Sequence, residues 1–368
     1  MRGHGADACA TADGCANIVT GVKLATQPRR CQPSQCRVGA APHGPAAAGV
    51  SAQTVSRVSN HHPGVTEPTR QRVLAAMKDL GYRPNAAARA LKSGSFRTIG
   101  VVMFDVVSTG NNSVLAAVND AVSERGFTTA LLTPRSRTRA CLSSAFERLD
   151  ELSVDGAVLM LEVSPDDPGF TVPDYDNLVI VDSTLGGSRA VVDTDQEGGA
   201  HSAVEHLLDL GHATVHHVTG PASSYSAQRR CAAWRAALTE AGRPVPQEVR
   251  GDWTPASGYA AGRELLRDPS CTAVFCANDE MAVGLLRAAA EAGRRVPEEL
   301  SVVGFDDIPL VTYLPVPLTT VHQDFAEMGR VAVDRLMRII ATGEADPGAR
   351  LVGTRLVRRA STAPPVGP

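Results

Sequence analysis

From Thr98 onward the sequence alternates short apolar runs with longer amphipathic stretches. Runs rich in Val, Ile and Leu are typical of strands that are buried on both faces of a sheet. Strands and helices that alternate along a chain form parallel sheets covered by helices, so we expect an α/β fold. The predicted strands are TIGVVMF (98–104), TTALLT (128–133), GAVLML (156–161), NLVIV (177–181), VHHVTG (215–220), TAVFCAN (272–278) and SVVGFDD (301–307).

Polar residues follow several of these predicted strands. Ligands of α/β sheets bind beyond the carboxyl ends of the strands, so these residues are candidates for a binding cleft. Carboxylates, amides and a guanidinium make charge-assisted hydrogen bonds to sugar hydroxyls, and aromatic rings cover the apolar face of a sugar. Asp and Asn at strand ends also commonly cap the next helix, so both roles stay open. The candidates are Asp182, Asn278, Asp279, Asp306, Asp307, Gln323 and Asp324, with Arg230 in a following helix and Trp253 and Phe325 as aromatic faces.

A second informative segment lies between Gly49 and Lys92. Ser51 stands where a helix N-cap is expected, and the residues after it form a polar helical face with Val55 and Val58 pointing inward. Gln, Thr, Ser and Arg in the first turns of a helix suit entry into the DNA major groove, where such groups bind base edges. An ordinary small amphipathic bundle would show the same isolated pattern.

The next predicted helix begins at Thr66 and ends at Gly81, with an apolar stripe of Val73, Leu74, Met77 and Leu80. Between Val50 and Thr98 there are eight basic residues and two acidic ones, although the whole chain carries a formal net charge of −3. A basic module on an acidic body indicates a phosphate-binding head.

The segment GVSAQTVSRVSN followed by TRQRVLAAMKDLGYRPNAAARAL resembles the headpiece and hinge of the LacI/GalR family of bacterial transcription regulators, and the resemblance continues to about Arg359. It implies an N-terminal helix-turn-helix headpiece and hinge helix, followed by a two-lobed core with a periplasmic-binding-protein-like fold. The implied divisions are a disordered or non-native extension (1–45), the headpiece (46–84), the hinge helix and linker (85–97), the effector-binding and dimerisation domain (98–360) and a tail (361–368).

The resemblance also implies contacts to double-stranded operator DNA. Recognition-helix residues would contact bases, other residues would contact phosphates, and Leu91 of a hinge helix over Asn85–Lys92 would be an apolar wedge in the minor groove. The implied DNA-binding residues are Ser51, Gln53, Thr54, Ser56, Arg57, Asn60, Thr66, Thr69, Asn85, Ala88 and Leu91.

Within the family, the segments GPASSYSAQRRCAAW, GDWTPASGY, ANDEMAVG and TTVHQDF are more similar to a galactoside-responsive branch than to the purine or ribose branches. This similarity implies a homodimeric repressor that is released from its operator by a small, galactoside-like sugar. The tail has no leucine heptads, so we expect a dimer and not a tetramer. The implied effector-binding residues are Asp182, Ser226, Arg230, Trp253, Asn278, Asp306, Gln323 and Phe325.

The stretch before Gly49 fits this picture poorly. It has little helical periodicity, which predicts disorder. A helix-turn-helix needs a first helix here, but Gly44 and Pro45 disfavour a helix interior, Pro by about 3 kcal/mol relative to Ala. Two explanations stay open: a misassigned start or reading frame, which we favour, or a degraded headpiece that binds DNA weakly.

The sequence argues against an enzyme and against a metal or cofactor. It lacks a GxSxG elbow, an HExxH helix and a phosphate-binding loop. We expect His206, His212, His216 and His217 to be packing and surface residues. The cysteines at positions 9, 15, 31 and 36 lack the paired spacing of a zinc site, and those at 141, 231, 271 and 276 are expected to be small buried residues.

The location is expected to be cytoplasmic. The sequence contains no continuous run of 18 apolar residues and no secretory signal, so we expect neither a membrane span nor export. The alternative to a regulator is a transport-type sugar-binding protein without functional DNA binding. The missing signal and the basic headpiece count against it.

Overall fold

The computed structural model describes residues 47–59, 62–81, 90, 94–104, 106, 108–136, 138–161, 172–182 and 189–365. The chain divides into two units, Met1–Pro84 and Asn85–Pro368, and each is described by itself.

The small unit contains two described helices, α2 (Ala52–Ser59) and α3 (Glu67–Asp79). Its core consists of Ala48, Val58 and Val73, with Val55 and Met77 packed against it. The backbone N–H of Thr54 donates to Oγ of Ser51 over 3.2 Å, which confirms the predicted N-cap. The predicted start of the second helix is also confirmed, since Thr66 is the N-cap residue of α3.

The predicted apolar stripe of α3 is partly wrong. Val73 is buried and Met77 packs beside it, but Leu74 is 49% exposed and Leu80 is 48% exposed. Leu74 lies one residue beyond Val73, about 100° around the helix and away from α2. Leu80 is the C-cap residue, beyond the last turn that contacts the core.

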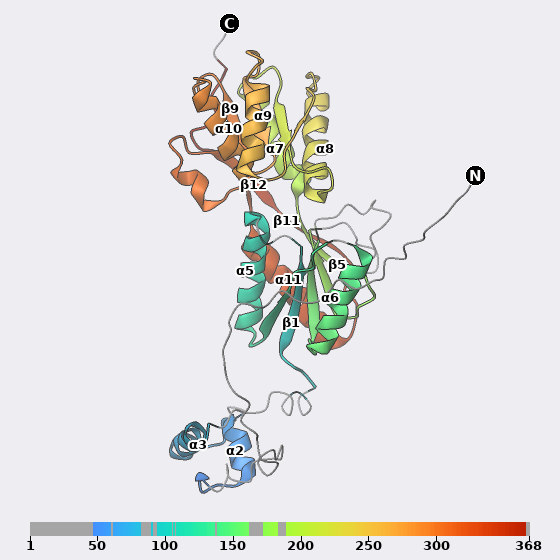
Figure 1. The fold of residues 1–368 in the computed structure, drawn as a ribbon, viewed down its shortest axis with the longest axis vertical. Helices are drawn as coiled ribbons and strands as arrows, with labels where there is room; N and C mark the ends of the chain where they lie inside the picture. Colours follow the sequence, from blue (N-terminus) through green and yellow to red (C-terminus); the bar gives the residue numbers. More distant parts are fainter. Residues whose placement is uncertain are drawn as a thin grey trace, which may run out of the picture. The chain divides into compact units, whose positions relative to one another are not determined.

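The first part of the large unit is built on a sheet that has six strands within the described residues, in the order β11-β5-β4-β3-β1-β2. Neighbouring strands of this sheet pair in parallel. Helices α5 and α11 cover one face and α6 covers the other (Figure 1). The bounds are β1 (Thr98–Met103), α5 (Thr109–Glu124), β2 (Thr128–Leu132), α6 (Arg139–Glu151), β3 (Gly156–Met160), β4 (Leu178–Val181), β5 (Ala190–Thr194), α11 (Phe325–Thr342) and β11 (Gly348–Val352).

A second sheet, again six-stranded in the described part of the chain, has the order β12-β10-β9-β8-β6-β7. Helices α7 and α8 pack on one face, and α9 and α10 pack on the other. Strand β12 runs antiparallel to β10, so this sheet is mixed and not purely parallel as predicted. The bounds are α7 (Gln196–Asp209), β6 (His216–Thr219), α8 (Tyr225–Glu240), β7 (Val249–Arg250), α9 (Pro255–Leu265), β8 (Ala273–Cys276), α10 (Asp279–Glu291), β9 (Ser301–Asp306), the 3-10 helix η1 (Pro309–Tyr313), β10 (Thr319–Gln323) and β12 (Thr354–Val357).

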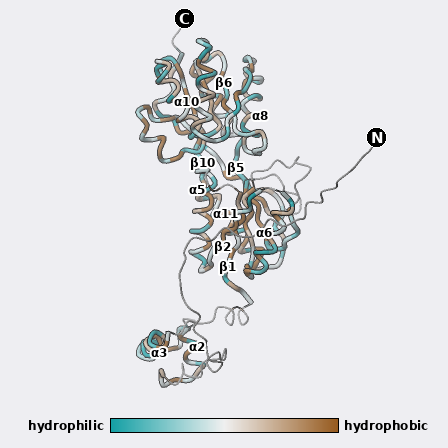
Figure 2. Tube along the Cα trace, in the orientation of Figure 1, coloured by the Kyte–Doolittle hydropathy of each residue, from teal (hydrophilic) through white to brown (hydrophobic). Residues whose placement is uncertain are grey.

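Each sheet buries both faces, which explains the apolar runs in the sequence. On β1, Ile99, Val101 and Met103 face α5 and α11, whereas Val102 faces α6. Figure 2 shows these hydrophobic stretches along the strands and helices of both sheets. All seven predicted strands are confirmed. No helix among the described residues is long and apolar enough to cross a membrane.

The described chain passes between the two sheets at three points. These are the connections from β5 to α7, from β10 to α11 and from β11 to β12. The strand ends beside the crossovers, together with Asp182 and Asn278, border the same space, where the candidate site lies.

Candidate functional site

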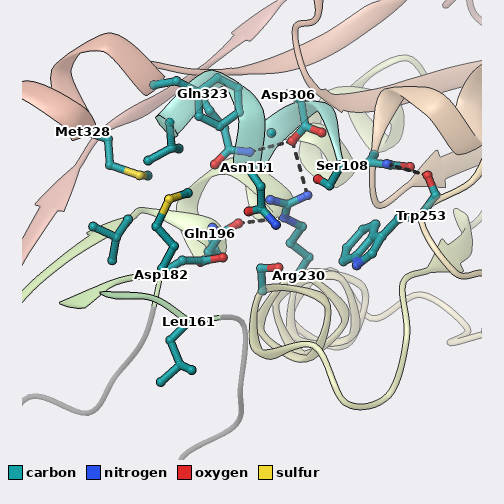
Figure 3. Close-up of a pocket in the computed structure, with 17 residues that line it drawn as sticks. Ser108, Asn111, Leu161, Asp182, Gln196, Arg230, Trp253, Asp306, Gln323 and Met328 are labelled. Carbon is teal, nitrogen blue, oxygen red and sulfur yellow. Dashed lines mark hydrogen bonds and ion pairs between the residues drawn. The ribbon is translucent and has the colours of Figure 1, made fainter. Parts of the chain in front are cut away.

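A cavity lies where residues of both sheets meet. Most of the polar residues that line it directly follow a strand or occupy the first turns of a helix, as the strand-end rule predicts (Figure 3). The structure brings all eight of the predicted effector-binding residues to this cavity: Asp182, Ser226, Arg230, Trp253, Asn278, Asp306, Gln323 and Phe325.

Arg230 occupies the centre of the site. It lies in the second turn of α8 and is 4% exposed. Its Nε donates to Oε1 of Gln196 over 2.7 Å, and its Nη1 donates to the carbonyl oxygen of Ala277 and lies 3.6 Å from Oδ1 of Asp306. The guanidinium also stacks over the Phe305 ring, 3.7 Å from its centroid. These contacts hold Arg230 in one orientation before any ligand binds.

Asp306 and Gln323 extend this network across two neighbouring strands. Nε2 of Gln323 donates to Oδ1 of Asp306 over 2.5 Å, and both side chains are buried. Strands β9 and β10 pair in parallel, which brings the two strand ends to the same edge of the sheet. Together with Arg230 they form a rigid group that can donate to and accept from ligand hydroxyls.

Trp253 provides an apolar wall beside Arg230 (Figure 3). Its ring lies 5.7 Å from the Arg230 guanidinium. Nδ2 of Asn278 donates to the Trp253 carbonyl over 3.0 Å, and Oδ1 of Asn278 caps α10 by accepting from Met281 N. The ring packs against Gly220, where an added Cβ would lie 2.4 Å from Cζ2 of the indole. A glycine at this position is therefore required for the observed ring position.

Asp182 is the exceptional polar group of the cavity. Its Oδ1 is buried and has no hydrogen-bond partner among the described residues. Burial, and then the neighbouring Asp193 carboxylate, raise the pKa of Asp182 to about 7, although Arg230 and Arg229 favour its charged form. A buried acceptor without a partner is costly, and the hydroxyl of a ligand would satisfy it.

Three polar cavity residues were not predicted. Ser108 and Asn111 follow β1, at and within the start of α5, and Gln196 follows β5 at the start of α7. The strand-end rule would have found all three if it had been applied to β1 and β5 as well. Apolar residues complete the lining, namely Val114, Met160, Leu161, Val181 and Met328.

Other strand-end candidates have structural roles and do not line the cavity. Asp279 is fully buried and accepts from the Thr320 hydroxyl and the Ile308 N–H. Asp307 is hydrogen-bonded to His322 and to Arg359, and Asp324 caps α11. Only Asp324 thus has the capping role that strand-end carboxylates often have, whereas Asp279 and Asp307 connect neighbouring segments of the second lobe.

The histidine interpretation is confirmed in three cases by specific packing partners. His206 pairs with Thr362, His212 with Thr272 and Ser301, and His217 stacks on Phe275. No cluster of metal-binding side chains occurs among the described residues. Cys271 and Cys276 are buried as predicted, but Cys141 and Cys231 are only half-buried, which corrects the prediction for those two.

The predicted DNA-binding residues are described only in part. Ser51, Gln53 and Arg57 are exposed on α2, where Val58 is the buried residue. The Thr66 hydroxyl donates to Oγ1 of Thr69 over 3.0 Å at the start of α3. Thr54 and Ser56 are half-buried. Asn60, Asn85, Ala88 and Leu91 lie outside the described residues, as do residues 1–46 with their four cysteines.

Comparison with known proteins identifies relatives of the whole arrangement. Residues 46–85 match the model of bacterial regulatory proteins of the lacI family, and residues 204–362 match the periplasmic binding protein-like domain. The chain is 34% identical to the lactose operon repressor of Escherichia coli over 332 residues, which is 86% of this chain and 89% of the relative. It is also 34% identical to the HTH-type transcriptional repressor PurR of Yersinia pestis, over 86% of this chain and 94% of that one.

Solved structures agree with these matches. The lac repressor dimer bound to operator and the anti-inducer ONPF superposes with a TM-score of 0.77 at 33% identity, covering 87% of this chain and 98% of that one. The complex of the transcriptional regulator CelR with cellobiose superposes with a TM-score of 0.64 at 33% identity, covering 86% and 98%. The predicted fold class, a helix-turn-helix headpiece followed by a two-lobed periplasmic-binding-protein-like core, is confirmed.

Proposed function

The chain belongs to the LacI family of bacterial regulatory proteins, and we propose that it is a repressor whose operator is released when a small sugar binds in the cavity. As a member of this family it is a DNA-binding transcriptional repressor and not an enzyme. The proposal concerns the class of effector, the residues that bind it and the consequence of binding. We place this activity in the cytoplasm, where DNA is accessible.

The observation that carries the sugar proposal is the preorganised group around Arg230. Arg230, Asp306 and Gln323 are buried and already held by one another, so few side chains must be ordered when a ligand binds. These three residues provide both hydrogen-bond donors and acceptors, and they lie beside the aromatic face of Trp253. A ligand with several hydroxyl groups and one apolar ring face matches such a lining.

The effector would act by connecting the two sheets. Asp182 follows a strand of the first sheet, whereas Arg230 and Asp306 belong to the second. A ligand that contacts both sides binds best to one relative arrangement of the two lobes, and it shifts the population toward that arrangement. We propose that the favoured arrangement in a homodimer is one in which the paired headpieces no longer fit a pseudo-palindromic operator.

Within the sugars, we propose a galactoside or a closely related small sugar. The support is the pattern of segments around Arg230, Trp253 and Gln323, together with the relation to the lactose operon repressor. The structure bound to cellobiose shows that a similarly related regulator takes a different sugar. Isothermal titration of the purified chain with galactose, lactose, cellobiose and ribose would distinguish these classes.

Arg230→Lys provides the direct test of the site. Lysine keeps the positive charge but cannot contact Gln196 and Asp306 at once, because it lacks the planar fork of arginine. We expect the dissociation constant of the tightest-binding sugar of the panel to rise at least tenfold, about 1.4 kcal/mol. The matched control is Arg235→Lys on the same helix, where the side chain is exposed and pairs with Glu248. It should bind the sugar as the unmodified chain does.

DNA binding is tested in the same preparation. An operator is first selected from random double-stranded DNA by the purified chain, and retardation in a gel is then measured with and without the sugar. Arg230→Lys should retain retardation and should respond only at sugar concentrations well above those that release the unmodified chain. If the chain binds the sugar but does not retard DNA in the gel, the result would instead favour a sugar-binding protein that does not bind DNA. Equal sugar affinity in Arg230→Lys and Arg235→Lys would exclude Arg230 from the site.

A further inference from the structure

We infer that the ion pair between the buried Asp193 and the half-buried Arg229 positions the polar side chains of the cavity and makes their arrangement depend on pH. This inference deepens the proposed function, because it concerns how the proposed effector site is held in shape. Neither residue lines the cavity.

The ion pair connects elements that belong to different lobes. Asp193 lies on β5 of the first sheet and is 1% exposed, and Arg229 lies on α8, which packs on the second sheet. Nη1 of Arg229 donates to Oδ2 of Asp193 over 2.6 Å, and its Nε donates to Oε1 of Glu197 on α7 over 3.2 Å. One guanidinium thus holds both ends of the crossover from β5 to α7.

The same crossover is tied to α8 a second time, inside the cavity. Arg230 follows Arg229 directly and donates to Gln196, which precedes Glu197. The two neighbouring arginines of α8 therefore bind two neighbouring residues of α7 as well as Asp193. Loss of the contacts that Arg229 makes with Asp193 and Glu197 would free the backbone that carries Gln196. It would also weaken the restraint on Arg230.

The strand register also brings Asp193, and with it the ion pair to Arg229, next to Asp182. Val181 pairs with Val192 in parallel strands, and the backbone N–H of Asp182 donates to the Val192 carbonyl over 3.0 Å. Asp182 and Asp193 are thus the next residues on adjacent strands. The charged groups that face these two carboxyls are Arg229 and Arg230 from α8, Glu197 from α7 and Asp306 from β9.

Two carboxylates and two guanidinium groups at such close range titrate together. Burial raises the pKa of Asp193 to about 6, although Arg229 favours the charged form, and burial together with Asp193 raises the pKa of Asp182 to about 7. Near neutral pH the cavity therefore changes its charge. Acidification neutralises Asp193, leaves Glu197 as the charged partner of Arg229 and so loosens the contact at the β5 end of the crossover.

Stability alone does not account for this pair. A buried ion pair pays a desolvation penalty that its attraction often only balances, and apolar residues of similar volume can be as stabilising. The pair contributes something that an apolar contact would not, namely two fixed charges that set the ionisation of Asp182 and the orientation of Arg230.

The test uses the full chain without any sugar and records the emission of Trp253, whose ring lies beside Arg230. Trp234, the other tryptophan, is replaced by Phe so that Trp253 alone is observed. The emission should change with pH along a curve whose midpoint lies between about 6 and about 7, the two values that apply to the carboxyl pair. Asp193→Asn should move this midpoint to lower pH, because it removes the charge that repels Asp182.

Arg229→Gln should move the midpoint in the opposite direction, since it removes a positive charge that favours both carboxylates. Arg229→Lys should restore the original midpoint. Glu205→Gln is the matched control and should have a small effect only, because Glu205 is an exposed residue of α7 whose ion-pair partner is His201. A purely structural role would lower stability without opposite shifts of the pH midpoint.

If Asp193→Asn does not fold, Asp193→Leu combined with Arg229→Leu replaces it, and the pH midpoint of this double variant is expected to fall. Midpoints that coincide in all variants, or an emission that does not respond to pH, would overturn the inference.

A second measurement separates this inference from the proposed function. The dissociation constants of lactose and cellobiose are measured at pH 6 and pH 8, and Arg229→Gln is expected to weaken binding about tenfold at pH 8, equivalent to about 1.4 kcal/mol. If neither sugar binds to the unmodified chain, the proposed effector is wrong while the pH midpoints still decide the role of the ion pair. Unchanged sugar affinity in Arg229→Gln would contradict the positioning role.

Discussion

Three residues that line the cavity have backbones in the left-handed region, where a side chain with a Cβ is disfavoured. The φ angles are 61° for Asp182, 71° for Trp253 and 115° for Asp306. Such conformations cost about 1–3 kcal/mol each and persist only where the surroundings enforce them. Asp182 directly follows β4, Asp306 is the last residue of β9, and Trp253 lies just before the start of α9, and all three line the cavity. The site therefore stores strain at the residues that would contact the ligand.

The position of Trp253 depends on a glycine, and Gly220→Ala tests this dependence. An added Cβ would lie 2.4 Å from the indole, so the ring must move away from Arg230. We expect sugar affinity to fall about tenfold, or 1.4 kcal/mol, because the apolar wall is displaced. Titration calorimetry measures the loss, and Trp253 emission reports the displacement. A variant with a shifted emission and full affinity would show that the ring does not contact the sugar.

The raised pKa of Asp182, about 7, predicts a pH dependence of stability. Between the ordinary value of 3.8 and about 7 the unfolded chain has lost this proton and the folded chain has kept it, so stability falls as pH rises through this window. Asp182→Asn cannot ionise and should remove this fall. Its advantage over the unmodified chain should grow from pH 4 to pH 8, as measured by urea denaturation at constant protein concentration.

Asp252→Asn is a control with the opposite sign. Hydrogen bonds from Thr254 and Ser257 lower the pKa of Asp252, so its contribution is lost only as pH falls through the acid range. A stability difference for Asp182→Asn that does not vary with pH would indicate that Asp182 ionises normally in the folded chain.

At the scale of helices and strands, the sequence predicted most of what the structure shows in the large unit. The strands could be predicted because each buries both faces, which requires continuous apolar residues such as those of NLVIV. The antiparallel direction of β12 could not be predicted, because TRLV has the same composition as a parallel edge strand.

The cavity residues were predicted where they lie in segments that resemble the family. Gln196 was missed because the strand before it, AVVDT, has a short apolar run and was not predicted, and Asn111 was missed because the strand-end rule was not applied to β1.

The contact between helices α9 and α10 shows a packing constraint between two elements. Each helix places a glycine against the backbone of the other: Gly258 faces Met281, and Gly284 faces Pro255. An added Cβ at Gly284 would lie 1.9 Å from the carbonyl oxygen of Pro255, which is part of the rigid helix start. The two helices can approach this closely only because both positions lack a side chain.

Gly284→Ala should therefore destabilise the second lobe although alanine favours a helix. We expect a loss of about 1–3 kcal/mol, the usual cost of overpacking, against a gain of about 1 kcal/mol from helix propensity. Ala290→Ser on the exposed side of α10 is the control and should change stability by about 0.5 kcal/mol or less. Thermal unfolding followed by circular dichroism measures both. A melting temperature of Gly284→Ala at or above that of the control would show that α9 and α10 can separate without loss.

On the scale of the whole molecule, the chain combines a unit with an exposed polar helix and a unit with a preorganised cavity. The exposed face of α2 carries Gln53 and Arg57. The cavity belongs wholly to Asn85–Pro368. Regulation requires that binding in the second unit alters binding by the first, and this coupling has a thermodynamic signature that needs no structural detail.

The signature is reciprocity. If the sugar weakens the affinity for the selected operator by some factor, the operator must weaken the affinity for the sugar by the same factor, because both describe one coupling free energy. We expect a factor of about 5–150, the range of 1–3 kcal/mol typical of allosteric proteins. Titration of the sugar into the free chain and into the operator complex gives one value, and gel retardation with and without the sugar gives the other. Arg230→Lys should lower the apparent coupling only by reducing occupancy, so saturating sugar restores it. A sugar that binds equally well to the free chain and to the operator complex cannot release the operator, however tightly it binds.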